Sequence, residues 1–190
     1  FGDMEGIIKN TCTRGSREDV IRRCMEILVG LSLKGYEGRS VGAIYLVGDI
    51  EKVRRYSTQM IINPFKGWKD VNIKDEGQLA TIEAFTQLDG AMIMDNRGFI
   101  HYAGRMIKVN ESQNKRPEKD FRKTPGKGSG TRWRAARFIT TLTKSIAITL
   151  STNGTITAFK EGKDLGKLER KPCMMRARDI PLYLQKSVQN

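Results

Sequence analysis

The residues best suited to bind phosphate stand at the start of a predicted helix, in the stretch Gly130-Thr131-Arg132-Trp133-Arg134. A helix that begins at Gly130 or Thr131 exposes unpaired backbone N–H groups and a partial positive charge, which suit a phosphate group. Arginine adds a planar, permanently charged fork that can bind phosphate oxygens in pairs. The chain has no Walker A motif, because Gly126-Lys127 is followed by Gly128. The alternative is a basic, solvated helix end, and this stretch alone leaves both interpretations open.

A carboxylate at a second junction could hold a divalent metal ion. Asp89 lies between an apolar helical stripe and a predicted strand, and Gly90 and Ala91 follow it. A carboxylate at such a junction, with small neighbours, is a natural ligand for Mg²⁺ or Mn²⁺. The alternative is an Asp-Gly turn without a metal.

Hydrophobic periodicity predicts the elements that position these residues. Helical spacing predicts helices over 16–35, 76–88 and 131–143, with a shorter one from Asp49 to about Tyr56. Apolar runs predict strands over 41–47, 91–94, 99–106, 145–151 and 155–160, the last two joined at Asn153-Gly154. This order predicts a single α/β domain with a central mixed β-sheet flanked by helices.

Composition favours an anionic partner. Lys and Arg outnumber Asp and Glu by 34 to 21, a net charge of +13, which suits nucleic acid, nucleotide or acidic lipid. The segment 111–137 holds nine basic and three acidic residues, so 9 − 3 = +6. Part of this charge lies in a polar loop over 108–130, which either contacts an anion or is simply solvated.

Cysteine and histidine usage excludes several kinds of site. The three cysteines are far apart and form neither a disulfide framework nor a metal motif, so we expect reduced thiols and a cytoplasmic protein. A single histidine, His101, excludes a multi-histidine metal centre. The sequence shows no apolar run long enough to span a membrane and no signal peptide. It also lacks an initiator methionine, as a fragment of a longer protein would.

The two motifs together resemble the diadenylate cyclase (DAC, or DisA_N) domain family. That family pairs a DGA motif with an RHR motif followed by two alanines, and then a strand that ends in serine. Here the corresponding residues are Asp89-Gly90-Ala91, Arg132-Trp133-Arg134-Ala135-Ala136 and Ser151. The stretches "VGDIEKV", "QMIINPFKGW" and "AGRMI" are similar to the stand-alone, archaeal type of this domain. We therefore expect an N-terminal helical segment over 1–40, the cyclase-like catalytic domain over 41–165, and a basic tail over 166–190.

The resemblance implies that two ATP molecules are condensed into cyclic di-AMP. Asp89 would hold Mg²⁺ or Mn²⁺ close to the attacking 3′-hydroxyl of the opposing ATP. The implied catalytic residues are Asp89, Arg132 and Arg134. The implied ATP-binding residues are Gly90, Ala91, Ile107, Gly130, Thr131, Arg132, Trp133, Arg134 and Ser151. Since each subunit binds one ATP and two sites must face each other, a homodimer or a larger homo-oligomer is expected.

Two departures from the family pattern keep other functions open. Trp133 replaces the middle histidine of RHR, and Thr152 stands where the family commonly has a glutamate. Tryptophan cannot be protonated and cannot accept a hydrogen bond. The hypotheses are therefore an active cyclase, a diverged relative that binds ATP or a cyclic dinucleotide with little turnover or makes a different product, and a basic nucleic-acid-binding module. Nucleic acid is the less favoured partner, because the basic loop has a single aromatic residue, Phe121.

Overall fold

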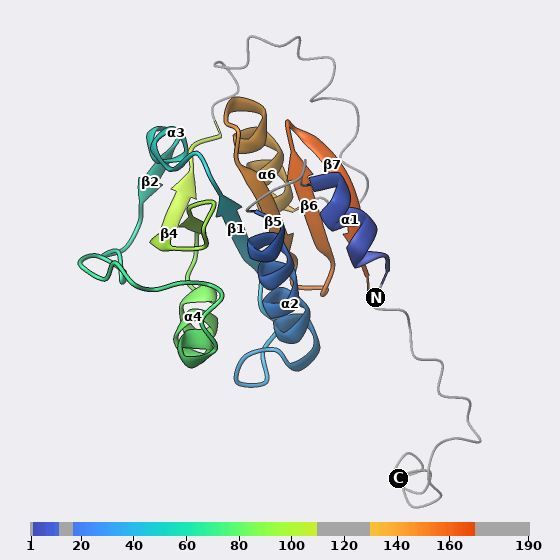
Figure 1. Cartoon of the computed structure of the whole chain (residues 1–190), viewed down its shortest axis with the longest axis horizontal. Helices are drawn as coiled ribbons and strands as arrows, with labels where there is room; N and C mark the ends of the chain where they lie inside the picture. Colours follow the sequence, from blue (N-terminus) through green and yellow to red (C-terminus); the bar gives the residue numbers. More distant parts are fainter. Residues whose placement is uncertain (1, 12–16, 110–129, 170–190) are drawn as a thin grey trace, which may run out of the picture.

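The computed structural model describes residues 2–11, 17–109 and 130–169, and their strands form one mixed sheet (Figure 1). The sheet has seven strands in the order β2-β4-β3-β1-β5-β6-β7. The strands are β1 (Ala43–Val47), β2 (Ser57–Gln59), β3 (Ala91–Met94), β4 (Ile100–Ile107), β5 (Ile146–Leu150), β6 (Ile156–Lys160) and β7 (Lys163–Leu168). The predicted α/β class with a central mixed sheet is confirmed.

Helices cover both faces of this sheet. They are α1 (Met4–Thr11), α2 (Glu18–Lys34), α3 (Ile50–Arg55), α4 (Leu79–Thr86) with the 3₁₀ turn η1 (Glu76–Gln78) before it, and α6 (Thr131–Leu142). In Figure 1, α2 lies in front of the central strands and α1 lies beside β7.

The central strand β1 is buried along its whole length because both of its faces are covered. Tyr45 belongs to the apolar cluster that includes Leu28 of α2 and Ile82 of α4. Leu46, its neighbour, belongs to the opposite cluster with Phe138 of α6. This arrangement explains why β1 and β5 are continuous apolar runs rather than alternating ones. It also places α6, and the motif at its start, on the opposite face from α2.

Several predicted elements agree with the structure and two were not predicted. The hairpin at Asn153-Gly154 is present as β5 and β6, paired in register from Ile146↔Lys160 to Leu150↔Ile156. The helix after Asp49 is also present, but the Asp49 side chain does not cap it. Its carboxylate instead accepts a hydrogen bond from the backbone N–H of Lys144, at 2.9 Å. Among the described elements, β2 and β7 were not predicted, and α1 was expected only as part of a helical segment over 1–40, without bounds of its own.

Two predicted segments fall largely outside the described residues. Most of the basic loop over 108–130 does so, as does the tail after residue 169. Strand β7 runs through position 165, where we expected the catalytic domain to end. The described helices include none that is both long and apolar enough to cross a membrane.

Candidate active site

The two sequence motifs meet at one edge of the sheet. Strands β1 and β3 are parallel, with Ile44 opposite Ala91, and β1 and β5 are antiparallel, with Ala43 opposite Leu150. Gly42 and Ser151 follow directly on the Ala43–Leu150 pair, and Asp89 lies two residues before Ala91, so all three lie at the same end of the neighbouring strands β3, β1 and β5. Adjacent strands are about 4.8 Å apart, so β3 and β5, on either side of β1, are separated by roughly 10 Å. A nucleotide phosphate can reach both positions across such a distance.

Arg132 reaches into the middle of this edge. Its guanidinium group lies against Gly42, where a Cβ atom added to the glycine would overlap it. The absence of a side chain at Gly42 therefore creates the space in which Arg132 lies. Gly42 is a site residue that the sequence did not predict, because the contact joins positions 90 residues apart. The only local signal was a glycine directly before a buried strand.

The start of α6 has the features expected of a phosphate-binding helix end. Gly130 occupies the N-cap position with an extended backbone (φ −74°, ψ 177°), and no side chain caps the helix there. Thr131 is exposed and no acidic residue lies in the first turn. Among the described residues no side chain caps these N–H groups, so the groups and the helix dipole can serve an anion.

The two arginines of the motif do not lie together. Residues two positions apart on an α-helix are about 200° apart around its axis. Arg132 is partly buried against the sheet edge, whereas Arg134 is exposed. One chain therefore presents Arg132 and Arg134 to two different places.

Trp133 is a packing residue in this structure. Its ring lies edge to face with Phe159 of β6, with centroids 5.5 Å apart and an interplanar angle of 83°. The guanidinium of Arg137 lies over the ring, 5.4 Å from its centroid. Trp133 also packs against the apolar cluster under α6. The indole therefore holds the first turn of α6 against the sheet.

Asp89 is exposed, and the two residues after it have structural roles. Gly90 has φ +104°, and a Cβ atom there would lie 2.7 Å from the backbone nitrogen of Arg105. Only glycine allows β4 to approach so closely. Ala91 is fully buried in β3. The small residues beside Asp89 thus fit the chain against β4 and present the carboxylate at the edge.

Ile107 and Ser151 lie at the margins of the site. Ile107 is 7% exposed and packs in the cluster that includes Ala135 of α6. The hydroxyl of Ser151 donates to the side-chain oxygen of Asn153 and lies 3.3 Å from the carbonyl of Thr155. The turn between β5 and β6 therefore orients this hydroxyl at the sheet edge.

Arg105 fixes β2 to the strand that supports Gly90. It is largely buried, and burial lowers the pKa of its guanidinium group. The guanidinium donates to the Ser57 hydroxyl at 2.8 Å, the Ser57 carbonyl at 2.8 Å and the Arg54 carbonyl at 3.0 Å. The guanidinium also lies over the aromatic ring of Tyr102, 4.9 Å from its centroid. These bonds replace water around a buried charge and hold the end of α3 against β4.

The described residues contain no cluster of three or more histidine, cysteine or acidic side chains that could enclose a metal ion. Asp89 thus belongs to no such cluster among the described residues, and its carboxylate is exposed. Mg²⁺ commonly binds through one or two carboxylates plus substrate phosphates and water. Asp89 fits an ion that arrives with a nucleotide, and it does not fit a metal held by the protein alone.

Comparison with known proteins agrees with this geometry. Residues 31–164 match the family model DAC, described as "DisA bacterial checkpoint controller nucleotide-binding". The chain is 35% identical over 147 residues to a diadenylate cyclase of Methanocaldococcus jannaschii, which covers 77% of this chain and 43% of that protein. It is 36% identical over 151 residues to a diadenylate cyclase of Haloferax volcanii, covering 78% of this chain and 52% of that protein. The chain thus spans about half the length of these curated relatives, or less.

A solved structure supports the fold independently. A double mutant of DacA from Staphylococcus aureus superposes with a TM-score of 0.51 at 19% identity, covering 90% of this chain and 93% of that one.

Proposed function

Because the chain belongs to the DAC family of nucleotide-binding domains, we propose that it is a diadenylate cyclase acting on two ATP molecules. The 3′-hydroxyl of each ATP attacks the α-phosphorus of the other, and each attack forms one phosphodiester bond. Each attack also releases one pyrophosphate and one proton, so that two attacks close cyclic di-AMP. The observation that carries this proposal is the meeting of Asp89, Arg132 and Ser151 at one sheet edge, next to the open end of α6.

The helix end and Arg132 bind the phosphates. Phosphoryl transfer needs in-line positioning and charge stabilisation more than it needs a covalent intermediate. The uncapped N–H groups of α6 offer fixed dipoles, and Arg132 offers two parallel donors from its place over Gly42. Ser151 adds a hydroxyl from the end of β5, the strand that pairs with β1 on the side opposite β3.

Asp89 is the residue that would hold Mg²⁺ or Mn²⁺ together with the nucleotide phosphates. The ion, when bound, neutralises phosphate charge and increases the acidity of the attacking hydroxyl. Asp89 itself orients that hydroxyl and accepts a hydrogen bond from it. Its exposure at the edge allows it to face the ATP of an opposing subunit.

Two copies of the chain are needed for the cyclic product. Each copy provides one such edge, and a cyclic dinucleotide contains two equivalent phosphodiester bonds. A face-to-face homodimer, alone or within a larger homo-oligomer, places each 3′-hydroxyl against the other nucleotide. The outward position of Arg134 is consistent with a role at the opposing site rather than at its own.

The adenine is expected to lie near Ile107, at the end of β4 beside the start of α6. Ile107 is almost fully buried, so only its rim can touch a base. The remaining contacts to the base must come from backbone groups and from neighbouring apolar side chains.

Incubation of the purified protein with ATP and Mg²⁺ or Mn²⁺, followed by mass spectrometry of the nucleotides, tests the proposal. We expect cyclic di-AMP from the wild type and none from Asp89→Asn, which removes a charge from an exposed position and should leave the fold intact. Product from both proteins in equal amounts would exclude Asp89 as a metal-binding residue.

A second function, nucleotide binding with little turnover, is favoured by one observation. Trp133 packs against Phe159 and, unlike a histidine, can neither be protonated nor accept a hydrogen bond. Measurable ATP binding without any cyclic product in the same assay would identify this second function.

A further inference from the structure

A groove with aromatic and basic walls lies away from the catalytic edge. It has a volume of about 580 Å³, and the lining residues that matter here are Phe65, Lys66, Trp68, Lys69, Arg97 and His101. Ligand sites in proteins commonly enclose roughly 300–1,000 Å³. The groove lies at the β3–β4 turn, whereas Asp89 precedes β3. Asp95 in that turn is six positions after Asp89, which along strand β3 is a span of roughly 20 Å.

The loop over 60–72 that forms one wall is attached to β4 at both ends. The side-chain amide of Asn63 donates to the carbonyl of His101 at 2.9 Å, and its oxygen accepts from the backbone N–H of Ala103 at 3.2 Å. At the other end, the backbone N–H of Ile100 donates to the carbonyl of Val71 at 2.9 Å. These bonds hold the loop as a fixed wall.

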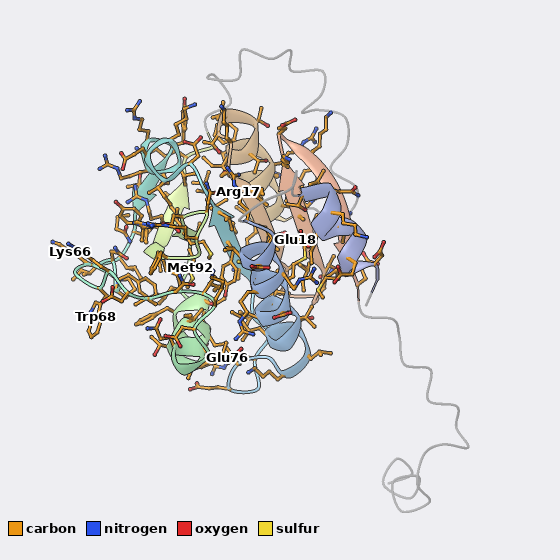
Figure 2. The ribbon with its side chains drawn as sticks, in the orientation of Figure 1. Arg17, Glu18, Lys66, Trp68, Glu76 and Met92 are labelled. Atoms are coloured by element: carbon orange, nitrogen blue, oxygen red, sulfur yellow. The ribbon has the colours of Figure 1, made fainter. Side chains whose placement is uncertain are left out.

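The tip of the loop carries one buried and one exposed aromatic ring. Phe65 is 4% exposed and packs edge to face on Phe85 of α4, with ring centroids 5.2 Å apart. Gly67 has φ +90°, which turns the chain so that the next residue points out. Trp68 is 70% exposed, although it is the largest apolar side chain of the loop. Figure 2 shows Lys66 and Trp68 projecting from this tip.

The opposite wall supplies a positioned cation. The guanidinium of Arg97 lies over the Phe99 ring, 5.2 Å from its centroid, and 3.3 Å from an Asp95 carboxylate oxygen. The groove thus has three basic side chains, Lys66, Lys69 and Arg97, against the carboxylates of Asp70 and Asp95. Asp95 accepts from the Arg97 side chain and from two backbone N–H groups, so Asp95 and Arg97 compensate each other within the turn. Lys66 and Lys69, opposed by Asp70, carry the remaining positive charge of the groove.

We propose that this groove is a second nucleotide-binding site, in which a nucleobase stacks on Trp68 and its phosphate is bound by Lys66, Lys69 and Arg97. An exposed tryptophan beside cations on a fixed wall is the arrangement that binds a base together with its phosphate. Asp70 accepts hydrogen bonds from the ribose hydroxyls. A free nucleotide and a segment of single-stranded RNA share this chemistry. The site does not depend on cyclase activity, because none of its residues lies at the catalytic edge.

The test uses the 190-residue chain carrying Arg132→Ala, which weakens phosphate binding at the catalytic edge, with its fold checked by circular dichroism. The two probes are adenosine monophosphate and a single-stranded RNA of four adenylate residues, the tetranucleotide. Tryptophan fluorescence reports on Trp68 together with Trp133, the other tryptophan of the chain, so the part that comes from Trp68 is found by comparison with Trp68→Ala. Equilibrium dialysis gives an independent dissociation constant. Variants for comparison are Trp68→Ala and Lys66→Ala, and Lys74→Ala is the matched control, since Lys74 is exposed but does not line the groove.

By equilibrium dialysis we expect saturable binding that Trp68→Ala weakens about 5- to 150-fold, the size of one base–aromatic stack, and the quenching in the parent protein should follow the same curve. Lys66→Ala should also weaken binding, whereas Lys74→Ala should change it less than about twofold. Binding of adenosine monophosphate identifies a free nucleotide as the ligand, and binding of the tetranucleotide alone identifies a strand. The proposal is overturned if neither probe binds up to about 1 mM, or if Lys74→Ala weakens binding as much as Lys66→Ala does.

Discussion

Gly42 is the residue whose role depends most on its lack of a side chain. A Cβ atom there would overlap the guanidinium of Arg132, the mobile end of a long side chain, and would meet no backbone atom. Gly42→Ala should therefore displace Arg132 while leaving the fold almost unchanged. We expect cyclase activity to fall about 10- to 100-fold, because small misplacements of a phosphate-binding group have effects of this size, with little change in Tm.

Gly30→Ala is the matched control for this prediction. Gly30 lies in α2 and has no atom within 4 Å of an added Cβ, so the substitution should leave the activity unchanged. Wild-type activity in Gly42→Ala would mean that catalysis does not depend on the position of Arg132 over Gly42.

The replacement of the family's histidine by Trp133 can also be tested with a single substitution. Replacing it with histidine removes the edge-to-face contact with Phe159 and the cation–π contact with Arg137. Trp133→His should therefore lower the stability by about 1–3 kcal/mol, less than the full cost of deleting a buried tryptophan. Thermal unfolding measures this loss, and the cyclase assay is run well below the new Tm. A rise in activity despite the lower stability would show that tryptophan impairs the natural enzyme.

At the scale of elements, the close approach of β3 and β4 makes Gly90 less tolerant of an added side chain than Gly42. Gly90 has φ +104°, and an added Cβ would meet the backbone of Arg105 at 2.7 Å, which cannot move aside as a side chain can. Gly90→Ala should therefore cost about 2 kcal/mol or more. For a chain of this size that lowers Tm by about 4–8 °C. An unchanged Tm would contradict the structural role of Gly90.

The stability that the β3–β4 turn gives to the fold should depend on pH through Asp95. Partial burial acts to raise the pKa of Asp95, but hydrogen bonds from the backbone N–H groups of Arg97 and Phe99 and from the Arg97 side chain outweigh it, so the pKa lies below its ordinary value. A lowered folded-state pKa means that the ionised carboxylate stabilises the fold above the unfolded pKa of about 3.9 and that this stabilisation is lost as pH falls through the folded value. The Tm difference between wild type and Asp95→Asn should therefore be largest near neutral pH and shrink below about pH 4. A Tm difference that stays constant between neutral pH and about pH 3 would contradict this role of the Asp95 carboxylate.

The elements missed by sequence reasoning are those whose stability comes from distant contacts. β2 is three residues long, Ser57–Gln59, and has no apolar alternation, so it forms because β4 and the buried Arg105 bind it. β7 is mostly polar and contains a glycine, yet it pairs along β6. By contrast, β1, α2 and the β5–β6 hairpin carry their signals locally, in apolar runs and in Asn153-Gly154. The site divides in the same way: motifs indicated Asp89 and Arg132, whereas Gly42 required the folded structure.

At the scale of the whole molecule, the cyclic product sets a requirement that one chain cannot meet. One copy offers one sheet edge and one α6 start, and its Arg132 and Arg134 point to different sides. The proposed reaction needs two nucleotides with their 3′-hydroxyls exchanged between copies. The rate of cyclic di-AMP formation should therefore depend on association of the chain with itself.

Dilution tests this requirement directly. At saturating ATP and at protein concentrations where most copies are single, halving the protein concentration should reduce the rate about fourfold, because the active species is the pair. At higher concentration the rate should become proportional to protein. Sedimentation velocity at the same concentrations must show the pair appearing as the specific activity rises. A specific activity that stays constant through the range where sedimentation shows single chains would mean that one copy completes the reaction, which contradicts the face-to-face arrangement.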